Sequence, residues 1–302
     1  MRTEIDHLPP AKQRELERVI GLLMGEFEQA IAGGTQPFRK NGKILKIILF
    51  GSYARGDWVD EPHNGYQSDF DLLIVVSHEK LTDIADYWYV AEDKILRDPK
   101  IGRTVNIIVH TLQEVNAALG KGQYFFTDIA RDGIVLYELP GHALATPMPP
   151  TAKDAYEVAK GYFEDWSKKI ESALKIARFA IEQSELNDGA FLLHQAVERC
   201  YACFLLVRTL YFPRSHNIKF LRSLAEQADA RLIGAWPRDN KTDRRRFELL
   251  KRAYVEARYS PSYKISAEDL DALAESAVRL RDVVQSVCLE RLETLRREAS
   301  AP

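Results

Sequence analysis

Two acidic side chains lie one residue apart at the start of an apolar segment. They are Asp69 and Asp71, in the sequence SDFDLLIVV over residues 68–76. Because side chains alternate between the two faces of a strand, both carboxylates point the same way, about 7 Å apart along the chain. Adjacent carboxylates repel each other, and a bound divalent cation would relieve that repulsion while gaining the oxygen ligands it prefers. The pair therefore predicts a site that holds Mg²⁺, or Mn²⁺, against a polyphosphate.

A second segment supplies groups suited to phosphate. Residues 49–56 read LFGSYARG, an apolar run followed by a Gly51–Ser52 turn and then Arg55. Backbone N–H groups of such a turn and the serine hydroxyl suit phosphate oxygens, and the arginine adds positive charge. Each feature alone is common, since Gly–Ser is an ordinary turn and Asp-x-Asp often ends a solvated strand. Their occurrence together, each beside an apolar run, favours a nucleotide site.

These two segments, GSYARG over residues 51–56 and SDFDLL over residues 68–73, resemble the signature of the minimal nucleotidyltransferases. This family belongs to the DNA polymerase beta-like superfamily, and the resemblance extends over about residues 20–140. It implies that the Gly–Ser pair binds the triphosphate of a nucleotide, and that the aspartates hold metal ions which activate the acceptor and stabilise the leaving pyrophosphate. The resemblance makes Asp69 and Asp71 catalytic and assigns nucleotide binding to Gly51, Ser52, Arg55 and Ser68.

The chain departs from the family pattern at one position. The family places a third carboxylate on the next strand, where this chain has Asn106. An amide can ligate a metal through its oxygen, but it is uncharged and cannot act as a general base. His110 on the same strand face, or Glu157 or Glu164 from the second half, could supply the missing group, or the metal-bound acceptor could suffice. The alternative is a regulatory or toxin–antitoxin-derived protein that binds nucleotide and turns over slowly or not at all.

Composition limits the class of protein. The chain has 302 residues, 46% hydrophobic and 28% charged, with a formal net charge of −2, as expected for two globular domains. Near-neutral charge argues against a basic nucleic-acid clamp over the whole molecule, although KTDRRR at residues 241–246 leaves a local patch open. No segment approaches the apolar length that spans a bilayer, and the N-terminus lacks a signal-peptide core. We therefore expect a cytoplasmic protein without a membrane partner.

Cysteine usage agrees with a reducing compartment. The chain has three cysteines, and an odd number does not suggest a disulfide framework. Cys200 and Cys203 form a C-x-x-C spacing, but it lies inside a long helical pattern without the preceding strand that a redox motif requires. Cysteines in a helix core are the favoured interpretation.

The first half alternates helical and strand patterns, which predicts an α/β domain with a mixed sheet. Its expected helices cover residues 16–31, 81–96 and 125–133, with another beginning near Leu112, and its expected strands cover residues 46–50, 72–76, 104–109 and 134–137. A loop over residues 57–67, longer than an ordinary turn, could close over a substrate beside the phosphate site.

A proline-rich linker over residues 140–150 separates the predicted domains, 1–139 and 151–302. The second half is helical throughout, with expected helices over residues 152–182, 187–209, 216–228, 242–258 and 266–297. This pattern predicts an up-and-down bundle. The fold class is therefore α+β with two domains, the first built on a mixed sheet and the second all-α.

The helical half resembles the HEPN domain over about residues 152–295. Three segments carry the resemblance: FLLHQAVER (191–199), SHNIKFL (215–221) and YVEARY (254–259). Many HEPN domains are ribonucleases that use an arginine and a histidine separated by four to six residues. Here Arg208 precedes His216 by one residue too many and Arg214 is too close, so the ribonuclease signature is absent.

The resemblance leaves a binding role for the helical half. The candidate site residues are His194, Glu198, His216, Arg258 and Tyr259, which could instead be polar groups that tie helices together. RNA binding through this half stays open as an alternative function. Fold-level analogy with aminoglycoside nucleotidyltransferases places the substrate between the domains or across a homodimer.

We therefore predict a nucleotidyltransferase that moves an NMP group from an NTP, ATP foremost, to a hydroxyl acceptor, with pyrophosphate leaving. The acceptor is open: an antibiotic, a tRNA end, a protein tyrosine or another metabolite. In the related toxin–antitoxin family the nucleotidyltransferase modifies a tyrosine of its HEPN partner. Tyr259 and Tyr263 are accordingly candidates for self-modification.

Overall fold

The protein folds into two compact units, Met1–Pro149 and Pro150–Pro302. The computed structural model describes residues 1–61, 66–213 and 215–300. Two predictions lie partly outside these ranges: the substrate loop over residues 57–67, of which residues 62–65 are not described, and the spacing of Arg214 from His216.

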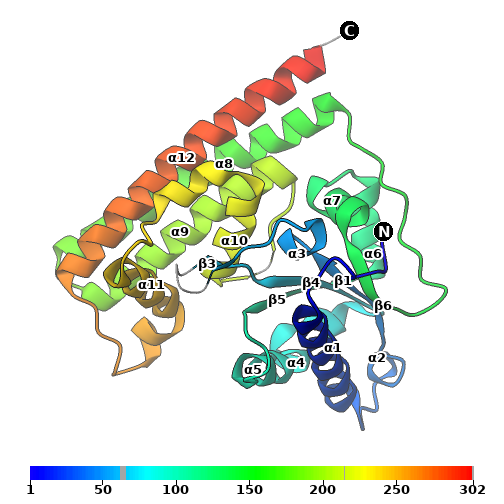
Figure 1. Cartoon of the computed structure of the whole chain (residues 1–302). Coiled ribbons are helices and arrows are strands. Elements are labelled where there is room, and N and C mark those ends of the chain that lie inside the picture. Colours follow the sequence, from blue (N-terminus) through cyan, green and yellow to red (C-terminus); the bar gives the residue numbers. More distant parts are fainter. Residues whose placement is uncertain (62–65, 214, 301–302) are drawn as a thin grey trace. The chain divides into compact units, whose positions relative to one another are not determined.

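The first unit is built on a four-stranded mixed sheet with the order β5-β4-β1-β6 (Figure 1). The strands are β1 (Ile44–Phe50), β4 (Phe70–Val76), β5 (Val105–Thr111) and β6 (Ile134–Glu138). β4 and β5 run parallel, whereas β1 is antiparallel to both of its neighbours. Every residue of β1 and β4 is buried, which explains why both strands are continuous apolar runs in the sequence. The predicted mixed sheet is confirmed.

Helices pack on both faces of this sheet (Figure 1). On one face α1 (Pro10–Ile31) contributes Leu16, Leu23 and Phe27 to a core shared with alternate residues of β1 and β4. α6 (Leu112–Gly120) and α7 (Tyr124–Asp132) follow β5, and Phe125 of α7 contacts Phe50 edge-to-face at 5.5 Å. The remaining short elements are α2 (Pro37–Lys40), α3 (Ser52–Arg55), β2 (Asp60–Glu61) and β3 (Tyr66–Gln67).

The single helix predicted over residues 81–96 is wrong. The segment forms a 3₁₀ turn at Glu79–Thr82, then α4 (Ile84–Tyr87) and α5 (Tyr89–Arg97). Asp83 has extended backbone angles, and its side chain caps α4 by accepting the Asp86 N–H at 3.0 Å. Trp88 is fully buried, stacks on Phe27 and donates to the Leu81 carbonyl at 2.8 Å. Burying this indole in the core therefore breaks the helix that local periodicity favours.

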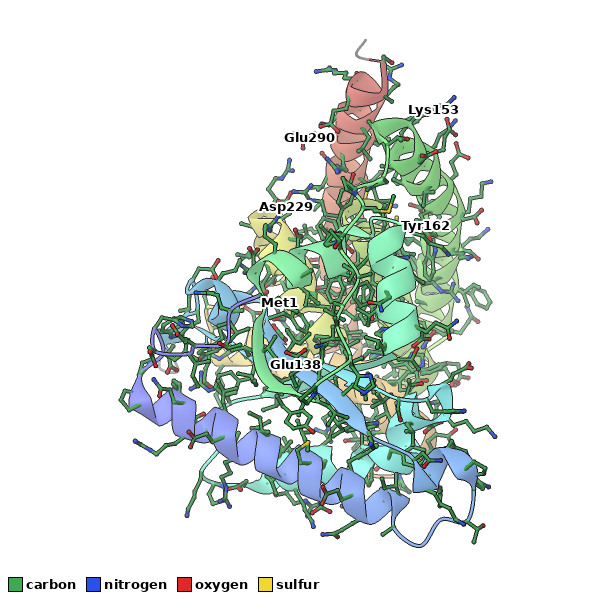
Figure 2. The ribbon with its side chains drawn as sticks, turned by 90° about the vertical axis from the view of Figure 1, so that its right-hand side faces the viewer. Met1, Glu138, Lys153, Tyr162, Asp229 and Glu290 are labelled. Atoms are coloured by element: carbon green, nitrogen blue, oxygen red, sulfur yellow. The ribbon has the colours of Figure 1, made fainter. Side chains whose placement is uncertain are left out.

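The N-terminal segment runs beside the sheet edge. Arg2 forms a parallel bridge with Ile134 of β6, and the Arg2 carbonyl accepts the Val135 N–H at 2.8 Å. Figure 2 labels Met1 and Glu138 on this side of the unit. The last residues of the unit also contact it, because the Met148 N–H donates to the Leu119 carbonyl of α6 at 3.0 Å. The proline-rich segment therefore packs, in part, on the first unit.

The second unit is a helical bundle. Its helices are α8 (Ala152–Glu182), α9 (Leu186–Thr209), α10 (Ile218–Ala228), α11 (Lys241–Tyr259) and α12 (Ala267–Ser300), with a 3₁₀ turn at Ala230–Ala235. α9 packs against each of the other four helices. α8 and α12 lie side by side, with Lys153 and Glu290 at the same end of the pair (Figure 2). The predicted helical bundle is confirmed, and its helices begin and end close to the predicted residues.

The expectation that no segment is apolar enough to span a bilayer is wrong for α9. Among the described residues this helix alone is long and apolar enough to do so by length and composition. However, 72% of its most apolar window is buried inside the bundle. A helix that is hydrophobic on all sides is expected at the centre of a bundle. The same burial covers Cys200 and Cys203, which are free thiols in the helix core as predicted.

Candidate nucleotide site and helical cluster

Strand register brings the acidic pair and the Gly–Ser turn to one end of the sheet. Asp71 of β4 lies opposite Phe50 of β1 on one side and Asn106 of β5 on the other. Gly51 follows Phe50 directly, and Asp69 precedes β4 by one residue. Three segments that are far apart in the sequence therefore meet at this edge.

One amide group joins the two carboxylates. Nδ2 of Asn106 donates to Oδ1 of Asp71 at 2.9 Å and to Oδ2 of Asp69 at 3.3 Å. The two carboxylates therefore point the same way, as strand alternation requires. Asp71 is fully buried, and Asp69 and Asn106 are only 6% and 5% exposed. The family's third carboxylate is thus replaced by a neutral donor that bridges the other two.

The residues fit a hard divalent cation with respect to donor type. Carboxylate oxygens are the ligands that Mg²⁺ and Mn²⁺ prefer. As oriented, Asn106 turns its nitrogen toward the carboxylates, so it would have to rotate its amide to offer a cation its oxygen. Within the described ranges, no group of three or more His, Cys, Asp or Glu side chains is arranged to hold a metal. Asp69 and Asp71 would therefore carry most of the charge at such a centre.

The Gly–Ser turn has a backbone that glycine alone adopts readily. Gly51 has φ 74° and ψ −153°, and α3 begins at the next residue. The Ser52 hydroxyl is buried and has no hydrogen-bond partner among the described residues. A buried hydroxyl that is left unpaired is destabilising unless a ligand or water satisfies it. The hydroxyl is therefore available to a bound group at the end of the sheet that carries Asp71.

Two residues near the N-terminus contact backbone carbonyls directly after this turn. The His7 ring contacts the Tyr53 carbonyl through Nε2 at 2.9 Å, and Arg2 donates to the Ala54 carbonyl. Burial, together with the nearby Arg2, lowers the pKa of His7. A neutral ring can donate this bond through Nε2–H. Sequence reasoning missed both residues, because nothing in their local pattern indicates a long-range contact.

The predicted residues of the helical unit also meet. Nδ1 of His216 lies 2.9 Å from Oε2 of Glu198, and Nε2 of His194 lies 3.1 Å from the His216 carbonyl. The ring of Tyr254 connects the histidines to Arg258. It stacks on His216 with the ring centroids 4.4 Å apart and lies 4.9 Å from the Arg258 guanidinium. Arg258 also covers Phe191 and Tyr259, at 4.6 and 4.9 Å. We call His194, Glu198, His216, Tyr254, Arg258 and Tyr259 the helical cluster.

The helical cluster contains buried and exposed groups. His194 is fully buried, and burial lowers its pKa despite the nearby Glu198. The His216 side chain is 56% exposed, and Tyr259 is 73% exposed. Tyr254 was missed as a site residue, although its spacing of four residues from Arg258 is a recognisable helical contact. His194 therefore ties α9 to the carbonyls of Leu250 and His216, while the remainder of the cluster presents a surface.

Comparisons with known proteins identify the family of each unit. The family model for the nucleotidyltransferase domain matches residues 36–114, which include Ser52, Asp69, Asp71 and Asn106. A protein of Methanocaldococcus jannaschii named as a protein adenylyltransferase is 38% identical over 98 residues, which are 32% of this chain and 81% of that protein. This chain belongs to the nucleotidyltransferase family. The HEPN domain model matches residues 163–287, so both family resemblances in the sequence are confirmed.

His110 is not part of the nucleotidyltransferase site. It pairs with Val75 in the register in which Asn106 pairs with Asp71, four residues or about 13 Å further along the sheet. Its Nδ1 lies 3.2 Å from Oε2 of Glu114, the residue that completes the capping box of α6. The suggestion that His110 replaces the missing carboxylate is therefore wrong. Glu157 and Glu164 lie on α8 of the second unit.

Two further predicted residues of the nucleotidyltransferase unit have local partners. Arg55 forms a half-exposed ion pair with Asp57 at 3.2 Å. The Ser68 hydroxyl accepts the Val59 N–H at 3.0 Å, and the Ser68 N–H donates to the Val59 carbonyl at 2.8 Å. Ser68 therefore extends the pairing of β2 and β3 by one residue, directly before Asp69. A nucleotide role for either residue stays a prediction.

Tyr263 is excluded as an accessible acceptor. It is 2% exposed, and its hydroxyl donates to the Leu249 carbonyl at 3.0 Å. Burial raises the pKa of Tyr263 to about 12. Of the two tyrosines considered for self-modification, Tyr259 alone presents its side chain to solvent.

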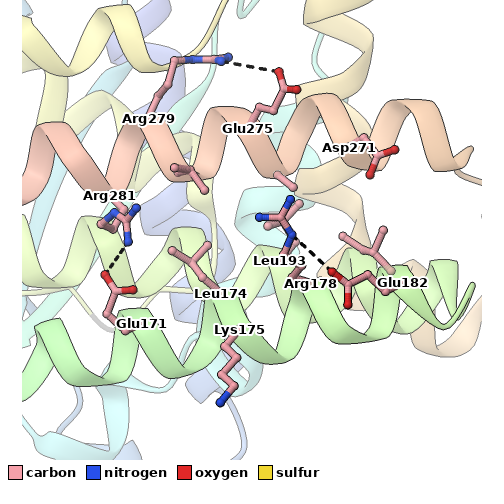
Figure 3. Close-up of a pocket in the computed structure, with 13 residues that line it drawn as sticks. Glu171, Leu174, Lys175, Arg178, Glu182, Leu193, Asp271, Glu275, Arg279 and Arg281 are labelled. Atoms are coloured by element: carbon pink, nitrogen blue, oxygen red, sulfur yellow. Dashed lines mark hydrogen bonds and ion pairs between the residues drawn. The ribbon is translucent and has the colours of Figure 1, made fainter.

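A groove between α8 and α12 lies elsewhere in the helical unit (Figure 3). It has a volume of about 960 Å³, and Leu174, Leu193 and Val278 are among its apolar lining residues. Ion pairs line its rims, including Arg281–Glu171 at 2.7 Å and Arg178–Glu182 at 3.6 Å. None of the helical cluster residues lines it.

The basic run at residues 241–246 is used within the bundle. Arg245 and Arg246 both donate to Asp269 of α12, with Nη2 of Arg245 at 2.7 Å and Nε of Arg246 at 2.9 Å from Oδ1. Asp269 is buried, and these two arginines hold its pKa low against the opposing effect of burial. The run therefore begins α11 and joins it to α12.

Proposed function

We propose that this nucleotidyltransferase transfers the AMP group of ATP to a hydroxyl group on a protein, with Mg²⁺ or Mn²⁺ held by Asp69 and Asp71. The observation that carries the proposal is the convergence of both carboxylates on one atom of Asn106, at the sheet edge that also carries the Gly51–Ser52 turn. The choice of AMP and of a protein acceptor is supported by the name of the relative from M. jannaschii.

The nucleotide would lie against the turn. The Gly51 backbone and the unpaired Ser52 hydroxyl would bind the β- and γ-phosphates. Arg55 would offset phosphate charge by exchanging its partner Asp57 for a phosphate oxygen. Because this turn is fixed by Gly51 and by the contacts of His7 and Arg2, it would be organised before the nucleotide binds.

In the transfer step the acceptor oxygen forms a bond to the α-phosphorus as the bond from that phosphorus to the β-phosphate oxygen breaks. Pyrophosphate leaves with that bonding pair. Asn106 cannot take the acceptor proton, so Asp69, the more exposed of the two carboxylates, would receive it. A divalent cation, when bound, would offset phosphate charge and lower the pKa of the acceptor hydroxyl.

Calorimetric titration of ATP, with and without Mg²⁺, tests the site. Wild type should bind ATP more tightly with Mg²⁺, and the Asp69→Ala, Asp71→Ala double variant should lose that enhancement. The matched control is Glu17→Ala, Glu28→Ala, which removes two exposed carboxylates of α1. Equal magnesium dependence in the wild type and the double variant would contradict the proposed site.

Transfer itself is tested with labelled ATP. Label on the α-phosphate should appear on protein after incubation with Mg²⁺, whereas label on the γ-phosphate should not. Intact-mass measurement of the wild type and Tyr259→Phe then separates self-modification from modification of another protein. Binding without transfer to any protein would favour the second candidate function, a nucleotide-binding regulator, which the replacement of a carboxylate by Asn106 supports.

A further inference from the structure

One arginine at the nucleotide end of the sheet is unusually buried. Arg103 lies just before β5, next to Thr104, whose carbonyl accepts the Phe70 N–H at 3.0 Å. The Arg103 side chain is 0% exposed. Burial lowers the pKa of Arg103 to about 10, so it still carries its charge near neutral pH. A buried charge is destabilising unless it is fully paired, so its presence here calls for a specific role.

The Arg103 guanidinium packs against one aromatic ring from each of the two sequence motifs. Its carbon lies 5.0 Å from the ring centre of Tyr53 and 4.9 Å from that of Phe70. The two rings meet edge-to-face at 4.5 Å, and both are fully buried. Tyr53 directly follows Ser52, and Phe70 lies between Asp69 and Asp71. Arg103 therefore contacts the residue that follows Ser52 and the residue that separates the two aspartates.

Two carboxylates fix the guanidinium in this place. Nε of Arg103 donates to Glu15 of α1 at 2.9 Å, and Nη2 contacts Asp60 of β2 at 3.5 Å. Lys12 bridges the same two carboxylates at 3.1 Å each, so the four charges form one network. Nη1 is buried and has no partner among the described residues. An apolar side chain would fill this position without an unpaired donor, so packing alone does not account for an arginine.

We infer that Arg103 is a positioning residue, which fixes the Gly51–Ser52 turn relative to the Asp69–Asp71 pair. A flat, charged guanidinium can contact two aromatic rings and two carboxylates at once, and a lysine ammonium cannot. The turn and the acidic pair belong to different strands, β1 and β4, and must bind the same triphosphate. This inference rests on the proposed function.

Arg103→Lys tests the inference, because it keeps the charge and removes the planar fork. The measured quantity is the factor by which Mg²⁺ strengthens ATP binding, together with kcat for AMP transfer. Both should fall, kcat by about 10–100-fold, because a small misplacement of reacting groups slows a reaction strongly. Binding of ATP without Mg²⁺ should fall less than either quantity, because Gly51 and Ser52 themselves are unchanged.

A second readout does not depend on activity. The N–H groups of Arg55 and Gly56, which bond to the carbonyls of Gly51 and Ser52, should exchange with solvent about tenfold faster in Arg103→Lys. The matched control is Glu26→Gln, which removes the α1–α5 ion pair with Lys94. It should lower stability while leaving kcat, the magnesium effect and the exchange of this turn as in wild type.

The outcomes separate the two proposals. Absence of a magnesium effect in wild type overturns the proposed function, whatever the variant does. A wild-type magnesium effect and exchange rate in Arg103→Lys overturn the positioning role alone. Equal losses in Glu26→Gln also overturn it, because the effect would then follow from general destabilisation. Arg103→Met, which keeps length and apolar contact, should exchange at least as fast as Arg103→Lys.

Discussion

The two units assemble their polar residues by different means. In the nucleotidyltransferase unit, hydrogen-bonded register places Asp71 opposite Asn106, and the site follows from which strands are neighbours. In the helical unit no register exists, and the ring of Tyr254 connects His216 to Arg258. In the sheet, backbone pairing alone brings the site residues together. In the helical bundle, the connection between His216 and Arg258 depends on the side chain of Tyr254.

The two groups also differ in exposure, and this difference suggests different roles. Asp69, Asp71 and Asn106 are almost completely buried. Electrostatic interactions with a ligand are stronger at a buried position than in water. His216 and Tyr259 are largely exposed, and the charges beside them are screened. The first arrangement suits chemistry on a bound nucleotide, and the second suits contact with another molecule.

The largest expected effect is on catalysis by the buried pair. Asp71→Asn keeps the shape of the side chain and removes its charge, so AMP transfer should fall by about three orders of magnitude. His110→Gln, on the same strand face but four residues along, should retain transfer. Initial rates with α-labelled ATP measure both variants. An inactive His110→Gln variant that is still folded would show that the site extends further along β5 than the register indicates.

The next effect concerns the amide that bridges the carboxylates. Asn106→Asp removes a donor shared by Asp69 and Asp71 and adds a third buried negative charge. Without Mg²⁺ the variant should lose about 1–3 kcal/mol of unfolding free energy, because an unsatisfied buried group and like charges both destabilise it. Added Mg²⁺ should restore more of its melting temperature than it gives wild type. Identical melting of both proteins in both conditions would argue against cation binding here.

A smaller effect is expected in the helical cluster. Tyr254→Leu removes the ring that stacks on His216 and lies against Arg258, so the helical unit should lose about 0.5–1.5 kcal/mol beyond the lost burial. Urea unfolding measures this loss, with the exposed Val255→Ala as control. The His216 ring protons should also shift in NMR spectra. A helical unit that keeps wild-type stability and His216 resonances would mean that Tyr254 does not organise the cluster.

The smallest effect is a pH dependence from His194. Burial lowers its pKa in the folded state, so the unfolded chain binds more protons below the ordinary histidine pKa of about 6.5. This contribution to stability is therefore present above about pH 6.5 and is lost as pH falls through the lowered folded pKa. Melting of the wild type between pH 7.5 and 5.5 should show a decrease that His194→Gln reduces. An unchanged slope in the variant would assign the dependence to other groups.

Much of the fold was predictable because local patterns agreed with tertiary packing. The strands β1 and β4 are buried on both faces, so their sequences are unbroken apolar runs. The long helices of the bundle carry clear starts, as at α8, where the Thr151 side chain accepts the Asp154 N–H. Prediction failed over residues 81–96, where burial of Trp88 overrides helical periodicity.

The candidate site was predictable only in part. Asp69, Asp71 and the Gly–Ser turn could be proposed from sequence because a phosphate and cation site would require these residue types in short segments. Arg103 and Tyr254 were not identified, since each acts through contacts across many residues of sequence. His110 was misjudged because strand alternation gives the face of a side chain but not its distance from the site.

The sequence by itself determined the two domains, their strands and most of their helices. It also supplied the residue types of the candidate nucleotide site, because these features depend on local periodicity and on chemistry within short segments. Tertiary structure alone decided that Asn106 bridges both aspartates, that Tyr263 is buried while Tyr259 is exposed, and that Arg103 lies between the two motifs. Those outcomes depend on strand order and on packing between distant segments, which no short pattern encodes.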